Sequence, residues 1–249
     1  MNEPMISDAA RIRDNLRHLR ERIETACARS GRRPETVKLL LATKTVPAER
    51  LRAAVDAGER LFGENKAQEL REKQPALADA PVEWHFIGHL QTNKVKDVIP
   101  YVTMIHSVDR LSLAEALHKR LSRDGKAMDV LIQVNTSEEP SKFGVRPEEA
   151  PMLIEQVAAF PTLRIKGLMT IGKLSADPKD ARRCFRLLRE IRDRARDLRL
   201  PGVEMAELSM GMSGDLEIAI EEGATIVRVG TAVFGERKYP DSYYWREGK

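Results

Sequence analysis

The sequence contains little of what several classes of protein require. It has two cysteines among 249 residues, Cys27 and Cys184, and neither belongs to a CxxC pair. A disulfide framework is therefore excluded, and we expect a reducing, cytoplasmic compartment. No apolar run approaches the roughly 18 residues of a membrane helix, and the first residues have neither the basic nor the apolar stretch of a secretory signal. We therefore expect no membrane partner.

Aromatic side chains and excess charge are also scarce. Aromatic residues make up 5% of the chain, and the formal net charge is +4. Proteins that bind single-stranded nucleic acid need aromatic stacking platforms together with positive charge. The sequence pI of about 9.1 therefore indicates a solvated basic surface, and no nucleic-acid partner is expected. Hydrophobic residues at 42% and charged residues at 32% are ordinary for a soluble globular chain and exclude a disordered one.

The chain does have a regular alternation of two hydrophobic patterns. Residues 1–31 carry one apolar stripe at helical spacing, with Ser7 as N-cap and Gly31 as stop, and predict an N-terminal helix. Short apolar runs that suit buried strands then alternate with amphipathic helical segments. The expected strands are 37–43, 61–65, 84–88, 104–108, 130–135, 165–170, 207–210 and 226–230.

Eight strands that alternate with helices indicate an α/β protein, a single (β/α)8 TIM barrel with an extra N-terminal helix. We expect one domain over residues 1–249, with the barrel at 37–236 and a C-terminal tail at 237–249. The alternative is an open, doubly wound sheet. In either case functional side chains are expected where strands end and the following loops begin.

Lys44 comes directly after the first apolar run. Its amine is therefore expected at the rim of the barrel, where it can lose solvation and attack a carbonyl group to form a Schiff base. The alternative is a lysine whose stem packs while its head stays in water.

Glycine and hydroxyl residues follow the last two expected strands. Ser213 lies in the loop after the seventh strand, and Gly230 and Thr231 end the eighth. The loops after these strands often bind phosphate in this fold, because glycines allow close approach while backbone N–H groups and hydroxyls donate hydrogen bonds. The alternative is that the glycines serve tight turns only. Arg228 is two residues before Gly230, so it is expected deeper on the same side of the strand, or else as a charge-paired core residue.

A rim lysine and a phosphate cradle together indicate a phosphorylated aldehyde or ketone as ligand. Two ligand classes remain open at this point, pyridoxal phosphate and a sugar phosphate in a Schiff-base aldolase. No metal site is expected, because His85 and His89 would lie roughly 13 Å apart if they were on a strand. His85 is instead expected to point into the barrel as a hydrogen-bonded core residue.

Short motifs follow one another along almost the whole chain. They are ATKT at 42–45, FGEN at 62–65 with Gln68 and Glu69, WHFIGHLQTNK at 84–94, HSVD at 106–109, QVN at 133–135, SKFG at 141–144, GLM at 167–169, LSMGMS at 208–213 and VRVGTAVFG at 227–235. In this combination the chain resembles the family of YggS-like pyridoxal phosphate homeostasis proteins.

The resemblance implies a barrel like the N-terminal barrel of alanine racemase, with pyridoxal 5'-phosphate (PLP) as a covalent cofactor. Lys44 matches the lysine that holds PLP as a Schiff base, and Arg228 matches the residue near the pyridine nitrogen. An arginine there disfavours a protonated pyridine and weakens the ring as an electron sink. The remaining matches are Ser213, Gly230 and Thr231 for the phosphate, and Asn65 and Met210 for the pocket lining.

By the same resemblance, the function is PLP binding and release in the service of PLP and amino-acid homeostasis, without established catalytic turnover. PLP-dependent apo-enzymes are the partners it suggests as recipients. The sequence has no counterpart of the second domain that supplies the other base in racemases, so a monomer is expected. The alternative is an enzyme, a PLP-dependent amino-acid racemase or decarboxylase that uses Lys44 as its base.

Three positions depart from the pattern of many relatives. Thr43 replaces a serine, Val46 replaces a second lysine and Gly214 replaces an aspartate. Thr43 keeps a hydroxyl. Val46 removes a nearby positive charge, so the sequence does not support a handover of PLP between two lysines at that place. Lys142 remains as another lysine within a matching motif.

Overall fold

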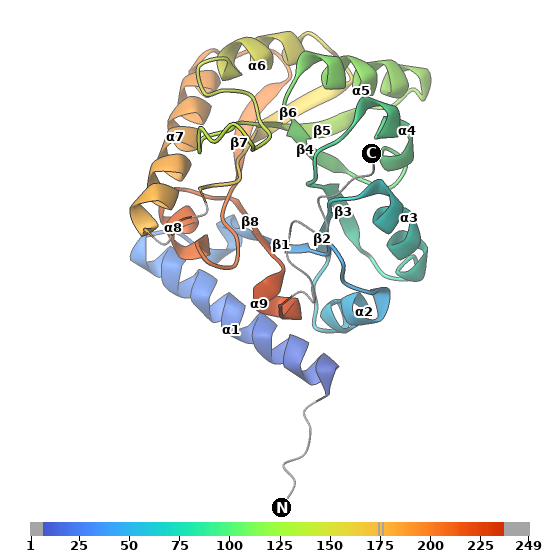
Figure 1. Ribbon diagram of the computed structural model, residues 1–249, viewed down its shortest axis with the longest axis vertical. Helices are drawn as coiled ribbons and strands as arrows, with labels where there is room; N and C mark the ends of the chain where they lie inside the picture. The colour runs from blue at the N-terminus through green and yellow to red at the C-terminus, as the bar shows by residue number, and fades with distance from the viewer. Residues whose placement is uncertain (1–6, 174, 176, 237–249) are drawn as a thin grey trace, which may run out of the picture.

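The computed structural model describes residues 7–173, 175 and 177–236 as a closed ring of parallel strands surrounded by helices (Figure 1). The strand order follows the sequence, and β8 pairs with β1 to close the barrel. The strands are β1 (Lys38–Ala42), β2 (Leu61–Glu64), β3 (Glu83–Phe86), β4 (Met104–Val108), β5 (Met128–Gln133), β6 (Leu163–Met169), β7 (Val203–Ser209) and β8 (Ile226–Val229). The predicted (β/α)8 barrel is confirmed, and the open sheet is excluded.

Helices connect the strands and cover the outside of the barrel, and a last short helix follows β8. They are α2 (Ala48–Asp56), α3 (Ala67–Ala76), α4 (Val95–Val98), α5 (Leu111–Arg123), α6 (Ala150–Ala158), α7 (Pro178–Asp197), α8 (Leu216–Glu221) and α9 (Thr231–Phe234), with short 3-10 turns at Pro34–Thr36 and Thr92–Lys94. Among the described residues no helix is long and apolar enough to cross a membrane.

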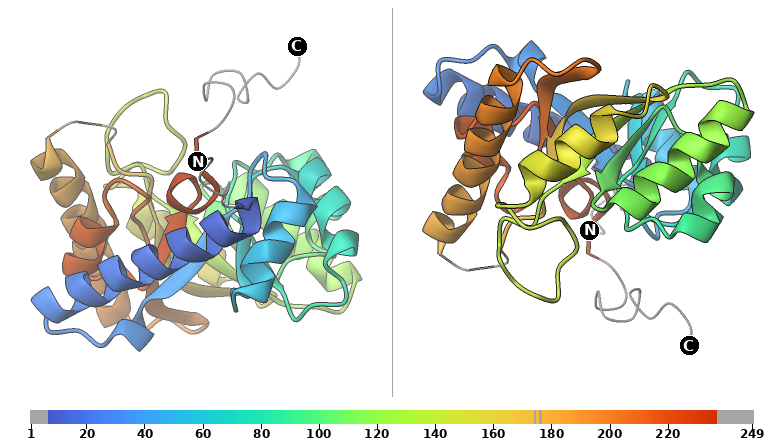
Figure 2. Two further views of the ribbon diagram at one scale, coloured as in Figure 1. Left: turned by 90° about the horizontal axis from the view of Figure 1, so that it is seen from below. Right: turned by 90° about the horizontal axis from the view of Figure 1, so that it is seen from above.

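Helix α1 (Asp8–Arg29) precedes the barrel, as the apolar stripe predicts. Its N-cap is Ser7, whose side chain accepts a hydrogen bond from the Ala10 N–H at 3.2 Å. The buried stripe is Ile12, Leu16, Leu19, Ile23 and Ala26. It packs against α8, α2 and α9, so α1 covers the outside of the barrel where its last strand meets its first (Figures 1 and 2).

The main hydrophobic core lies between the strands and the helices, while the barrel interior is partly polar. Two small apolar clusters fill part of the interior, Leu40 with Ile87 and Ile226, and Met104 with Leu131 and Met169. His85, His106, Ser209 and Arg228 are also buried there and are hydrogen-bonded to one another. The expected burial of His85 as a hydrogen-bonded core residue is confirmed.

The predicted strands agree with the structure except at their ends. The largest difference is β7, which begins at Val203 and not at residue 207, because its first half alternates buried and exposed side chains and lacks a continuous apolar run.

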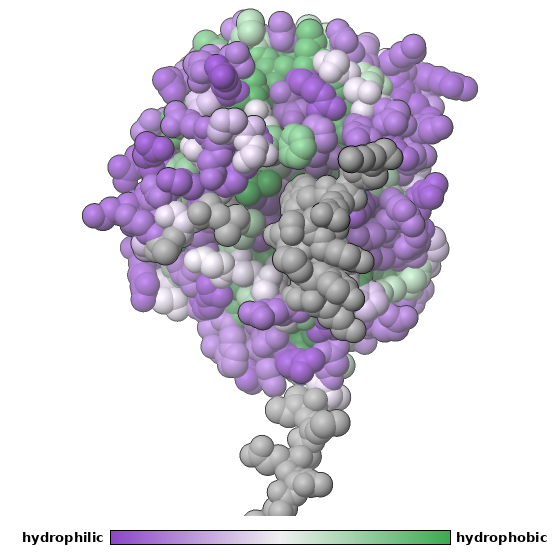
Figure 3. All heavy atoms as spheres, in the orientation of Figure 1, coloured by the Kyte–Doolittle hydropathy of each residue, from purple (hydrophilic) through white to green (hydrophobic). Residues whose placement is uncertain are grey.

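The viewed face of the molecule carries mainly hydrophilic side chains with apolar ones scattered between them (Figure 3). Since all strands are parallel, the loops that follow them lie at one end of the barrel.

Candidate functional site

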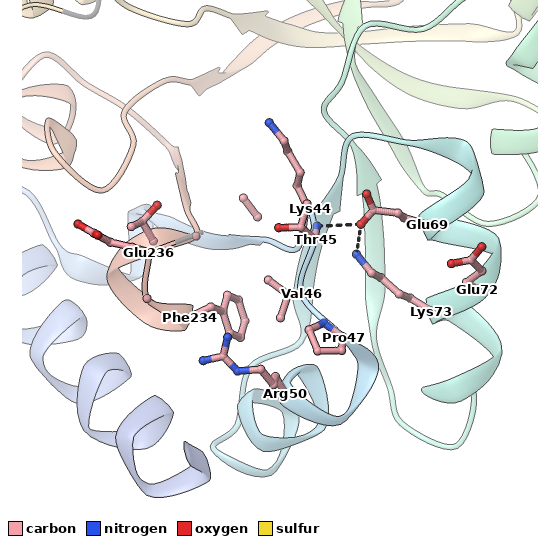
Figure 4. A pocket seen from close by; sticks show the side chains of 14 residues that line it. Lys44, Thr45, Val46, Pro47, Arg50, Glu69, Glu72, Lys73, Phe234 and Glu236 are labelled. Atoms are coloured by element: carbon pink, nitrogen blue, oxygen red, sulfur yellow. Dashed lines mark hydrogen bonds and ion pairs between the residues drawn. The ribbon is translucent and has the colours of Figure 1, made fainter. Parts of the chain in front are cut away.

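A cavity of about 670 Å³ lies beside the carboxyl ends of β1 and β8 (Figure 4). Three of the predicted site residues line it, namely Lys44, Gly230 and Thr231. Its other lining residues are Ala42, Thr45, Val46, Pro47, Arg50, Glu69, Glu72, Lys73, Phe234, Gly235 and Glu236. The volume is within the range of small-molecule sites, roughly 300–1,000 Å³.

Lys44 occupies the second position after β1 and is 7% exposed. The backbone turns sharply directly after it, because Thr45 has a φ of +63°. A β-branched residue rarely adopts this conformation, which costs on the order of 1–3 kcal/mol and persists only when its surroundings impose it. The Thr45 N–H donates to Glu69 Oε2 at 2.8 Å. A carboxylate therefore holds the turn that directs the Lys44 side chain away from Glu69 (Figure 4).

Glu69 belongs to a buried group of polar side chains, here named the Lys73 cluster, which consists of Thr43, Glu64, Glu69 and Lys73. Lys73 Nζ donates to Glu64 Oε2 at 2.7 Å, to Glu69 Oε2 at 2.6 Å and to the Thr43 carbonyl at 2.7 Å. The Thr43 hydroxyl donates to Glu64 Oε2 at 2.7 Å. Burial raises the pKa of Glu64 above its ordinary range, and the Lys73 ammonium offsets part of that rise. The cluster joins α3 to the ends of β1 and β2.

The loops after β7 and β8 meet beside the same cavity. Ser213 Oγ accepts a hydrogen bond from the Ala232 N–H at 3.2 Å, which leaves the Ser213 O–H as a donor. At Gly230 a Cβ would lie 3.0 Å from the Ala42 carbonyl oxygen, so a larger residue would press on the end of β1. The predicted gathering of Ser213, Gly230 and Thr231 is therefore consistent with the geometry.

Arg228 is 6% exposed and lies inside the barrel. Its N–H groups donate to Ser209 Oγ at 2.9 Å and to the Thr170 carbonyl at 2.8 Å. In the described part of the chain no carboxylate forms an ion pair with it, so the alternative of a charge-paired core residue is not observed. Burial lowers the pKa of Arg228 to about 10, which still leaves the guanidinium charged at neutral pH.

The other predicted residues lie outside the lining of this cavity. Asn65 follows β2, is half-buried, and its N–H donates to Glu64 Oε1 at 2.6 Å. Met210 follows β7 and is fully buried in the main core. Lys142 donates to the Gly172 carbonyl at 3.0 Å and pairs with Glu139. Val46, by contrast, lines the cavity with an apolar side chain.

The sequence reasoning did not identify the Lys73 cluster. The motif at 62–65 with Gln68 and Glu69 predicts no role for Glu64 or Glu69, and Lys73 belongs to none of the motifs. A signal was present in the spacing, because Glu69 and Lys73 are four residues apart on one helix face. No group of three histidine, cysteine or carboxylate side chains suited to a metal ion occurs within residues 7–173, 175 and 177–236.

Comparison with known proteins gives one family over most of the chain. Residues 7–238 match the family model described as the N-terminal domain of alanine racemase. A pyridoxal phosphate homeostasis protein of Aquifex aeolicus is 49% identical over 226 residues, covering 91% of this chain and 98% of the relative. Its counterpart in Pseudomonas aeruginosa is 46% identical over 228 residues, covering 92% and 96%.

Solved structures give the same picture. PipY of Synechococcus elongatus, solved with PLP bound, superimposes with a TM-score of 0.78 at 33% identity, over 90% of this chain and 100% of that one. A protein of Bifidobacterium adolescentis described as unknown gives a TM-score of 0.87 at 39% identity, over 94% and 98%. An alanine racemase of Clostridium difficile, at 15% identity over 92% of this chain and 58% of that one, shares the fold with a TM-score of 0.73.

Proposed function

This chain belongs to the family of pyridoxal phosphate homeostasis proteins, and on that premise we propose that it binds PLP through a Schiff base on Lys44. The observation that carries the proposal is the cavity in which Lys44, Gly230 and Thr231 meet. An amine is the group that condenses with an aldehyde, and releases one water as the C=N bond forms. Lys44 is nearly buried, and the turn after it is strained. Both features suit a side chain that is held in position to react with one ligand.

The residues around Lys44 also fit the rest of the ligand. Ser213 and Thr231 supply hydroxyl donors and Gly230 has no side chain to fill the space, which suits a phosphate group. Asn65 and Met210 do not line the cavity, and we propose that they support the pocket from behind its lining, at the ends of β2 and β7. When bound, PLP supplies an aldehyde that condenses with amines and a ring that withdraws electrons from them.

Arg228 favours binding over turnover. Its guanidinium stays charged without a carboxylate partner among the described residues, and a nearby cation disfavours a proton on the pyridine nitrogen. An unprotonated ring withdraws electrons less strongly, so cleavage of a bond at the α-carbon of an amino acid is not promoted. We propose that the protein stores PLP and releases it to apo-enzymes whose own lysine replaces Lys44, and thereby supports PLP and amino-acid homeostasis.

We further propose that the chain acts as one domain and as a monomer in a reducing, cytoplasmic compartment. Both cysteines are buried and unpaired, which suits such a compartment. The exposed large apolar side chains among the described residues are Phe143, Met152 and Leu198, which lie on three different segments. Sedimentation equilibrium of the full chain with and without PLP tests the monomer.

The visible absorption spectrum before and after borohydride reduction tests PLP binding, followed by mapping of the labelled peptide. We expect a yellow protein that bleaches on reduction, with the label on Lys44. Lys44→Ala is expected to lose the label and keep the fold, while the matched control Lys142→Ala keeps the label. A protein that stays colourless with added PLP, or a label that persists in Lys44→Ala, contradicts the proposal.

Hydrogen exchange at the α-carbon of added amino acids separates a carrier from an enzyme. We expect no exchange with deuterated solvent above the rate of free PLP. Exchange that depends on Lys44 would favour a racemase or decarboxylase. Borohydride trapping that requires an added sugar phosphate would favour an aldolase.

A further inference from the structure

A row of hydrogen-bonded side chains crosses the interior of the barrel from β3 to β8. It is named here the histidine row and consists of Glu83, His85, His106, Ser209 and Arg228. Glu83 Oε1 lies 3.2 Å from His85 Nε2, and His85 Nδ1 lies 2.9 Å from His106 Nε2. His106 Nδ1 lies 3.0 Å from Ser209 Oγ, which accepts from Arg228 Nη1 at 2.9 Å.

The two ends of the row lie in different surroundings. Glu83 is the first residue of β3, at the end of the barrel opposite Lys44, and its side chain is 54% exposed. At the other end, Arg228 and His106 are buried, and Ser209 is fully buried as well. The row therefore connects water at one end of the barrel with a charged group of the proposed site.

The chemistry of the ends gives the row a direction. A guanidinium only donates hydrogen bonds and a carboxylate only accepts them. Arg228 therefore donates to Ser209, and His85 Nε2–H donates to Glu83. With one hydrogen on each ring, His106 Nε2–H must donate to His85 Nδ1, and the Ser209 hydroxyl donates to His106 Nδ1. Each ring then carries one hydrogen, on Nε2, and both rings are neutral.

We propose that His85 and His106 are positioning residues for Arg228. The neutral row uses the hydroxyl hydrogen of Ser209 and leaves its oxygen to accept from Arg228. Ser209 Oγ thereby holds Nη1 of the guanidinium, and the Thr170 carbonyl oxygen accepts from Nη2 at 2.8 Å. The consequence for PLP rests on the function proposed above.

The charged groups around the row favour its neutral state at the inner end. Full burial lowers the pKa of His106 well below its ordinary value, and His85 on β3, Arg228 on β8 and Lys38 on β1 lower it further. Lys38 is paired with Glu207 on β7 at 2.6 Å, and Asp215 before α8 is the carboxylate that acts on Arg228. Glu83 on β3 is the carboxylate in contact with His85. His106 is therefore held neutral at the inner end of the row.

Nuclear magnetic resonance of the full chain with ¹⁵N-labelled histidine, without PLP, tests the direction of the row. At pH 8 we expect His85 and His106 to be neutral, with hydrogen on Nε2. Substitution of each histidine by glutamine assigns its signals, and His118→Gln, outside the barrel, is the matched control expected to leave both rings unchanged. Hydrogen on Nδ1 of either ring, or on both nitrogens, overturns the proposal.

PLP binding tests the consequence for Arg228. His106→Phe cannot accept from Ser209, and we expect PLP to bind about threefold to tenfold more weakly, the equivalent of one ordinary hydrogen bond. His106→Gln can both donate and accept and is expected to restore most of the affinity. Equal affinity in wild type and His106→Phe overturns the role in positioning Arg228. Absence of PLP binding in the wild type contradicts the proposed function alone, because the resonance experiments still decide the row.

Discussion

Two cations of this molecule are equally buried, one under helix α3 and one inside the barrel, and they differ in their partners. Lys73 and Arg228 are each 6% exposed. Lys73 contacts two carboxylates and a carbonyl oxygen. Arg228 contacts a hydroxyl and a carbonyl oxygen.

The difference follows from the hydration of the two groups. An ammonium is a compact, strongly hydrated charge, and burying it without a charged partner is costly. A guanidinium spreads its charge over a plane and is more weakly hydrated, so it can remain charged among neutral partners. The charge of Lys73 is neutralised by its two carboxylate partners, Glu64 and Glu69. The Lys73 cluster therefore stabilises the turn after Lys44. The charge of Arg228 remains available to act on a bound molecule.

The largest expected effect comes from removing the ammonium of Lys73. Lys73→Met leaves two carboxylates without their cation, and we expect the free energy of unfolding to fall by about 3–5 kcal/mol. The loss is expected to shrink at low pH, because Glu64 has a raised pKa and becomes neutral on protonation. Urea unfolding between pH 4 and pH 8 measures the loss of stability and its dependence on pH, with Lys94→Met on an exposed turn as control. A loss equal to that of the control contradicts the comparison.

Removing the guanidinium of Arg228 is expected to cost less. Arg228→Met leaves neutral partners, the Ser209 hydroxyl and the Thr170 carbonyl, and about 1–3 kcal/mol of stability is expected to be lost. With PLP bound, the pKa of the pyridine nitrogen is expected to rise, because a nearby cation is gone. Urea unfolding gives the first quantity and a pH titration of the visible spectrum the second. A larger loss of stability than in Lys73→Met, or an unchanged titration of the bound PLP, would contradict the structural role given to Lys73 and the role toward the ligand given to Arg228.

A smaller effect is expected at Glu69. In Glu69→Gln an amide oxygen can still accept from the Thr45 N–H, while the charge opposite Lys73 is lost. We expect a loss of about 1 kcal/mol, with borohydride labelling of Lys44 preserved. Glu69→Ala removes the acceptor altogether and is expected to slow labelling of Lys44. Equal labelling rates in the two variants would show that Glu69 does not hold the Lys44 turn.

The smallest effect is expected at Glu83. The hydrogen bond from His85 lowers the pKa of Glu83 from 4.5 to about 2. A carboxylate with a lowered pKa contributes stability above its unfolded pKa and loses that contribution as the pH falls through its folded pKa. Because this side chain is 54% exposed, the contribution is expected to stay below about 1 kcal/mol. Wild type is therefore expected to exceed Glu83→Gln slightly above pH 5, with the difference vanishing near pH 2, and a constant difference would contradict this.

The sequence predicts local features of this molecule well. Each apolar run of four to seven residues became a strand, and Lys44 lies just beyond the carboxyl end of β1 because the first run, 37–43, stops directly before it. Gly230 and Thr231 reach the same cavity because β8 pairs with β1, which the closed barrel requires.

Features that depend on distant side chains were not predicted. The left-handed turn at Thr45 has no sequence signal, since glycine is the residue expected there. Ser209 and His106 are 103 residues apart and meet only across the barrel. Hydrophobic periodicity shows which way a side chain faces, but it does not show which polar groups meet.

The position of α1 makes completion of the fold depend on both ends of the described chain. The Asn15 side chain donates to the Val233 carbonyl at 3.0 Å, across 218 residues of sequence. During synthesis at roughly 5–20 residues per second, α1 emerges on the order of 10–40 seconds before α8 and α9, the later of the helices that cover its apolar stripe. Contacts of such long sequence separation slow folding, because the closure of a long loop precedes the gain from its contacts. The nascent chain therefore spends most of its synthesis with α2 as the one helix of the described chain available to cover the stripe of α1.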